Sequence, residues 1–130
     1  MDEHVVTEFI EFLQKTFGES LRSVLYYTQD DYELRYIRDD VAEEYSDEEI
    51  ATVAKHLQID AMSRHIAERR YTHDSLRCQI QSFEGGIEMN FIGEENEGVA
   101  VGLDPRAFVT HETFIGKCVS ILEVESETTN

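Results

Sequence analysis

The stretch that decides the fold is residues 75–103, which read SLRCQIQSFEGGIEMNFIGEENEGVAVGL. Apolar and polar residues alternate through it with a period of two, which is typical of strands that bury one face. One face of its first strand is apolar: Leu76, Cys78 and Ile80. Gly85 and Gly86 then permit a tight reversal, and GEENEG, residues 93–98, forms a second loop. We therefore predict a meander of three strands.

A hairpin precedes this meander. Residues 24–37 read VLYYTQDDYELRYI, two runs rich in aromatic and β-branched residues on either side of the polar turn QDD. The hairpin and the meander together predict five strands.

Helices flank the strands. Apolar residues recur at three- and four-residue steps over residues 5–17, and Gly18 is a natural stop. Ser46 with Glu49 forms a capping box, and the helix that begins there is predicted to continue to about Arg70. A last helix is predicted from apolar residues that recur at helical spacing: Phe114, Ile115, Cys118, Val119 and Leu122.

These elements give an α+β fold in the order α-β-β-α-β-β-β-α, with the helices packed on the sheet. No flexible linker divides the chain, so we predict one domain over residues 1–122, followed by a disordered acidic tail over residues 123–130.

The element order resembles the roadblock-type dynein light chain family, within the profilin-like architectures. The hairpin of residues 24–37 and the meander of residues 75–103 carry the resemblance, although the turn QDDY lacks the glycine common in that family. The resemblance implies a five-stranded antiparallel sheet, with the long second helix on one face and the terminal helices on the other. It also implies dimers that join at the strand after the long helix, which would place Arg77, Gln79 and Gln81 near a partner.

The charge is strongly negative. The chain has 28 acidic and 11 basic residues, a net charge of −17, and only three of the bases are lysines. This composition looks like that of proteins from salt-accumulating halophilic archaea, since salt screens the self-repulsion of a compact acidic domain. An acidic mesophilic protein is the alternative. Such a surface repels nucleic acids and anionic membranes.

The location is predicted to be cytoplasmic. No apolar run is long enough to span a bilayer, and the start MDEHVVTEFIEF is acidic where a signal peptide is basic. Cys78 and Cys118 each lie among apolar residues, so we expect two buried thiols and no disulfide.

Catalytic patterns are missing from the sequence. It has no phosphate-binding glycine loop, no nucleophile elbow, no paired-cysteine zinc motif and no HExxH motif, and its histidines match no standard metal spacing. We therefore predict no catalytic residue, no cofactor and no metal, and we expect that the protein is not an enzyme.

One segment differs in charge. Residues 55–77 contain five bases and three acids, a net charge of +2, so the rest of the chain carries −19. The arginines there either dock a partner or pair with the domain's own acids. The predicted partner-binding residues are Arg64, Arg69, Arg70, Arg77, Gln79 and Gln81.

The functional hypothesis is a homodimeric protein-protein interaction or regulatory module, whose further partner is another cytoplasmic protein. The alternative is a small-molecule sensor of PAS or GAF type, and an enzyme of unfamiliar type also stays open. The sensor would enclose its ligand among Tyr26, Tyr36, Met89 and Phe91.

Overall fold

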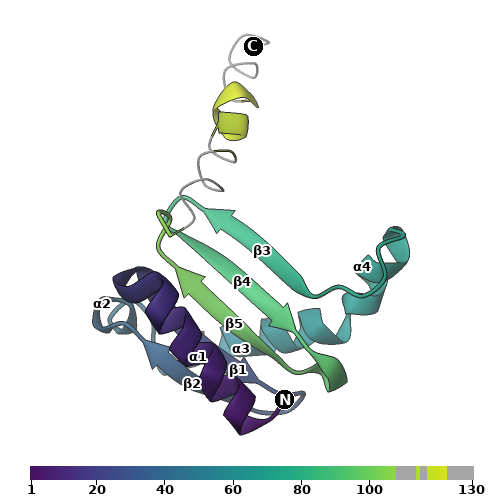
Figure 1. Ribbon diagram of the computed structural model, residues 1–130, viewed down its shortest axis with the longest axis horizontal. Helices are drawn as coiled ribbons and strands as arrows, with labels where there is room; N and C mark the ends of the chain where they lie inside the picture. Colours follow the sequence, from purple (N-terminus) through teal and green to yellow (C-terminus); the bar gives the residue numbers. More distant parts are fainter. Residues whose placement is uncertain (108–113, 115–116, 123–130) are drawn as a thin grey trace.

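A five-stranded antiparallel sheet forms the centre of the structure, a computed structural model that describes residues 1–107, 114 and 117–122 (Figure 1). Its strands are β1 (Leu21–Tyr27), β2 (Tyr32–Ile37), β3 (Cys78–Phe83), β4 (Gly86–Ile92) and β5 (Gly98–Leu103). They are ordered β2-β1-β5-β4-β3, and every neighbouring pair is antiparallel. The predicted α+β class, the hairpin and the meander are confirmed.

Helix α1 (Glu3–Phe17) covers one face of this sheet (Figure 1). The helix begins after Asp2, whose carboxylate accepts a hydrogen bond from the His4 backbone N–H at 3.1 Å. It ends at Gly18, whose φ of 53° is a conformation that glycine adopts without steric cost. One stripe of the helix is buried against β1, β4 and β5: Val6, Ile10 and Leu13.

Helix α3 (Asp47–Met62) covers the opposite face (Figure 1). The predicted capping box is confirmed, since the Glu49 N–H donates to Ser46 Oγ at 3.1 Å and the Ser46 N–H donates to Glu49 Oε1 at 2.9 Å. Ala54 and Ala61 are fully buried, and their small side chains let the helix approach the strands closely. The two faces therefore hold separate cores.

The prediction that this helix continues to Arg70 is wrong. Ser63 leaves the helical conformation, with φ −95° and ψ 3°, and a separate helix, α4 (Arg64–Arg70), follows. Ala61 is the last buried residue of α3, so burial no longer dictates the direction of the chain beyond it. The guanidinium of Arg64 instead donates to the Gly93 carbonyl at 2.6 Å, which ties the start of α4 to the loop after β4.

A short helix, α2 (Asp39–Ala42), occupies the segment that sequence analysis treated as an acidic connector. Arg38, just before it, donates to the carboxylates of Asp40 (2.6 and 3.0 Å) and Asp104 (2.8 and 3.1 Å). These paired contacts join the end of β2 to the end of β5, and they hold the pKa of both carboxyl groups below the ordinary value.

The end of the described chain differs from the prediction. Residues 117–122 are helical, but their side chains are exposed, and Cys118 is exposed where a buried thiol was expected. Cys78 is partly buried, yet Leu76 packs with the α3-side core because β3 begins only after it. Ile115 and the predicted tail, residues 123–130, lie outside the described residues. No helix in the described part of the chain is both long and apolar enough to cross a bilayer.

Candidate functional site

Strand β3 is an edge strand without a charge. Its six residues read CQIQSF, whereas β2 at the other edge carries Glu33 and Arg35. Charged side chains on an edge strand prevent other chains from pairing with it. In a chain of which 30% of residues are charged, β3 is therefore the edge that invites pairing.

The backbone of β3 offers hydrogen-bonding groups to this edge. The Ile92 N–H donates to the Arg77 carbonyl at 3.0 Å, and hydrogen-bonded and non-bonded residue pairs alternate along an antiparallel ladder. Cys78 and Ile80 therefore direct their N–H and C=O groups away from β4, toward the outside of the sheet.

Apolar side chains beside this edge are exposed. Ile80 is 47% exposed on the α1 face, and Phe83 is 53% exposed on the α3 face. On α3 and α4, near the start of β3, three more large apolar side chains are exposed: Ile59, Met62 and Ile66. The uncharged edge strand thus carries exposed apolar side chains of its own on both faces.

The structure does not bring all the predicted partner-binding residues together. Arg69 and Arg70 lie exposed in the last turn of α4, Arg77 lies exposed just before β3, and Arg64 is engaged with the Gly93 carbonyl. Gln79 and Gln81 lie apart from them, on the α3 face of β3, where they line a groove.

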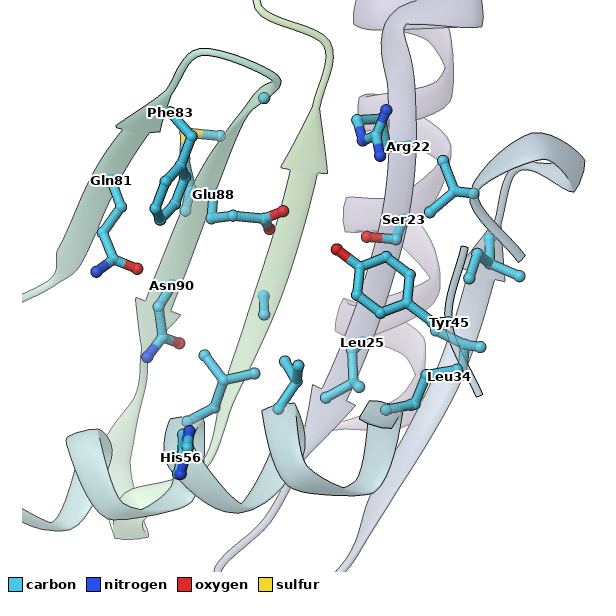
Figure 2. Close-up of a pocket in the computed structure, with 18 of the residues that line it drawn as sticks. Arg22, Ser23, Leu25, Leu34, Tyr45, His56, Gln81, Phe83, Glu88 and Asn90 are labelled. Atoms are coloured by element: carbon cyan, nitrogen blue, oxygen red, sulfur yellow. The ribbon is translucent and has the colours of Figure 1, made fainter. Parts of the chain in front are cut away.

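This groove lies on the α3 face of the sheet and has a volume of about 1090 Å³ (Figure 2). Strands β1, β4 and β5 form its floor, α3 forms one wall, and the segment that contains Tyr45 forms another. Leu25, Leu34 and Leu57 supply apolar surface at the end near α3. Sequence analysis missed this groove because its lining comes from six separate segments of the chain.

A row of polar residues crosses the groove floor. Strand register aligns Gln81 with Glu88, Glu88 with Gly102, and Gly102 with Ser23. A shift of register between Leu21 and Ser23 marks a β-bulge in β1, which lets both Arg22 and Ser23 face the groove. The period of two predicts the alternation along each strand but not this bulge.

The two charged residues of the floor have different surroundings. Arg22 is held by acids of its own chain, with Nη2 at 2.9 Å from Glu44 Oε2 and Nη1 at 3.5 Å from Asp104 Oδ1. Glu88 has no ion-pair partner among the described residues. Its side chain meets solvent along the groove, but protein atoms displace part of the hydration of the carboxyl group. This desolvation raises the pKa of Glu88 to about 7, and Arg22 opposes the rise.

At the end of the groove floor near α3, a buried pair contains an unsatisfied amide. Tyr27, fully buried, donates its hydroxyl to Asn90 Oδ1 at 2.6 Å. Asn90 is only 6% exposed, and its Nδ2 has no hydrogen-bond partner in the described structure. Either orientation of the amide leaves one of its two polar atoms unpartnered, because only Tyr27 reaches it.

The residues of the sensor alternative do not enclose a shared site. Met89 belongs to the buried α1-side core, Tyr26, Tyr36 and Phe91 pack against that core, and of the four only Met89 also borders the groove. No group of three or more metal-ligating side chains is found among residues 1–107, 114 and 117–122.

Comparison with protein families matches residues 7–123 to the domain of unknown function DUF7522. The match spans most of the chain, so the chain belongs to this family. A search of curated proteins found no match.

Proposed function

We propose that this member of the DUF7522 family is a homodimeric protein-interaction module whose two copies join along β3. The observation that carries the proposal is the uncharged, exposed edge strand in a chain of net charge −17. Two such chains repel each other wherever their acidic surfaces meet, so contact is favoured where charge is lowest.

A two-fold axis through the middle of β3 accounts for the features of this edge. Antiparallel pairing of β3 with its copy would use the outward backbone groups of Cys78 and Ile80, and it would continue the sheet across both copies. The apolar surface of Ile80 would become buried near the axis. This arrangement agrees with the dimer that the roadblock resemblance implies.

The basic segment beside β3 supports the same interface. Arg69, Arg70 and Arg77 are exposed, and residues 55–77 carry +2 while the remainder carries −19. Across the axis, Arg77 at the start of β3 would lie beside the end of β3 in the other copy, where Glu84 is exposed. Arg64 has a structural role in its own chain and contributes less.

Light scattering at molar KCl tests the proposal, because high salt removes general repulsion but leaves strand pairing in place. The wild-type protein is expected to have the mass of two chains, and Ile80→Lys that of one, with an unchanged circular dichroism spectrum. Tyr32→Lys is the matched control, since Tyr32 is 43% exposed on the other edge strand. A monomeric wild type contradicts the proposal, and a dimeric Ile80→Lys variant excludes β3 as the interface.

A further inference from the structure

We infer that the groove between α3 and the sheet binds a small organic cation, an ammonium group on an apolar body, with the ammonium held between Glu88 and Ser23 above Gly102. This site goes beyond the dimer proposal and uses other residues. It also does not use the residues of the sensor alternative.

The absence of a side chain at Gly102 lets Ser23 and Glu88 bring their oxygens together over β5. A Cβ atom at this position would lie 2.7 Å from Ser23 Oγ and 3.2 and 3.3 Å from the two carboxylate oxygens of Glu88. Three side-chain oxygens therefore converge just above the bare backbone of β5. An ammonium group has three N–H donors and no acceptor, which suits a site where acceptors predominate.

Charge selects a cation over an anion at this site. Glu88 makes no ion pair among the described residues, and Arg22, the cation that lowers its pKa, is itself balanced by Glu44 and Asp104. Glu44 and Asp60 also line the groove, and the whole chain carries −17. An anionic ligand would meet net repulsion, and a cation would supply the partner that Glu88 lacks.

Apolar side chains in the walls of the groove suit the apolar body of the proposed ligand. Phe83 and Tyr45 are both about half exposed, and Val53 and Leu57 of α3 continue the apolar surface. Figure 2 shows the Glu88 carboxylate and the Ser23 and Tyr45 hydroxyls turned toward the middle of the groove. Aromatic faces attract cations as well as apolar groups, and the volume is at the upper end for a small-molecule site.

Asn90 adds a fixed polar group to the floor near α3. It lines the groove, it is buried, and one atom of its amide has no partner among the described residues. The unpartnered atom is the donor Nδ2, and a buried donor without a partner is destabilising, so an acceptor on a bound ligand would gain a hydrogen bond there.

Binding measured by calorimetry and by NMR titration tests the inference with three probes of similar shape: 2-phenylethylammonium, 2-phenylethanol and 3-phenylpropionate. The ammonium compound is expected to bind at least about tenfold more tightly than the alcohol, since a hydrogen bond to a charged group contributes about 1.5–3 kcal/mol. The carboxylate is expected not to saturate the site. Equal affinity for the ammonium and the carboxylate overturns the inference.

Variants locate the charged end. Glu88→Gln is expected to lose at least about tenfold in affinity for 2-phenylethylammonium, because it removes the charge but keeps the shape. Glu84→Gln is the matched control: Glu84 is exposed in the turn between β3 and β4 and does not line the groove. Unchanged affinity in Glu88→Gln contradicts the assignment.

The pH dependence adds an independent measurement. Affinity for the ammonium probe should rise about tenfold between about pH 6 and pH 8 as Glu88 ionises, and Glu88→Gln should lack that rise. The variant separates Glu88 from the other titratable groups that line the groove: Arg22, Glu44, Tyr45, His56 and Asp60. An identical rise in the variant assigns the titration elsewhere and overturns the role of Glu88.

The experiments distinguish failure of the dimer proposal from failure of the ligand site. The Ile80→Lys variant keeps every groove side chain that the inference uses, so it should bind the ammonium probe whether or not it dimerises. Binding by a monomeric Ile80→Lys variant but not by the wild-type dimer would show that a second copy fills the groove, and it would overturn the ligand site.

Discussion

Removing the Tyr27 hydroxyl, in Tyr27→Phe, measures how much the buried pair under α3 contributes to stability. Tyr27 is fully buried, and its hydroxyl donates at 2.6 Å to an amide that is 6% exposed. The variant leaves both polar atoms of the Asn90 amide without a partner among the described residues. Because the desolvation of a buried unsatisfied group is not recovered, we expect a loss of about 1.5–3 kcal/mol in the free energy of unfolding.

Urea unfolding followed by circular dichroism at fixed KCl provides the assay. Tyr26→Phe is the control, since the Glu97 carboxylate that the Tyr26 hydroxyl bonds at 3.1 Å also pairs with the amino group of Met1 and so keeps a partner; it should lose less than Tyr27→Phe. Replacing both partners, in Tyr27→Phe with Asn90→Leu, should cost less than Tyr27→Phe alone. The reasoning is refuted if Tyr27→Phe loses no more than Tyr26→Phe.

Four further predictions concern salt, the Glu88 carboxyl group, helix capping and the thiols. The melting temperature should rise between about 0.1 and 3 M KCl, mostly within the first molar, and a flat response would contradict the halophilic interpretation. The wild-type protein should lose stability relative to Glu88→Gln as pH rises from about 5 to about 8, because the Glu88 carboxyl ionises near pH 4.5 in the unfolded chain but keeps its proton until about pH 7 in the folded one. A difference between the urea midpoints of the two proteins that stays the same across this pH range would refute the prediction. Ser46→Ala should lose about 1 kcal/mol in urea unfolding, and no loss would mean that the capping box is not stabilising. A thiol reagent should label exposed Cys118 before partly buried Cys78, whose thiol pKa burial raises; the reverse order would contradict their placement.

Local patterns in the sequence predict most of this fold. The period of two over residues 75–103, the stripe of α1 and the capping box at Ser46 each depend on neighbours within a few positions, so they can be read from the sequence directly. The break at Ser63 could not be predicted, because it depends on where α3 leaves the sheet and on the contact between Arg64 and Gly93.

The groove was not predicted. Gln79 and Gln81 were singled out as partner-binding residues of a strand that joins two copies, whereas the structure places them in the lining of the groove. In the sequence, Glu88 looks like any other polar residue on a strand. The groups near its carboxylate depend on the strand register, which sets it opposite Gly102 of β5, and on the missing side chain at Gly102. The prediction that Cys118 is buried was wrong, because apolar residues at helical spacing indicate an amphipathic helix but do not show that its apolar face packs against the rest of the protein.

The position of β5 constrains how the chain acquires its structure. β5 lies between β1 and β4 in the sheet, although it is the last of the five strands along the sequence. Until residues 98–103 have left the ribosome, the β1–β2 hairpin and the β3–β4 hairpin have no common neighbour, and an isolated hairpin is at best marginally stable in water. Synthesis of the first 97 residues should therefore yield no stable sheet, and folding should follow the insertion of a strand that contacts residues more than 70 positions earlier.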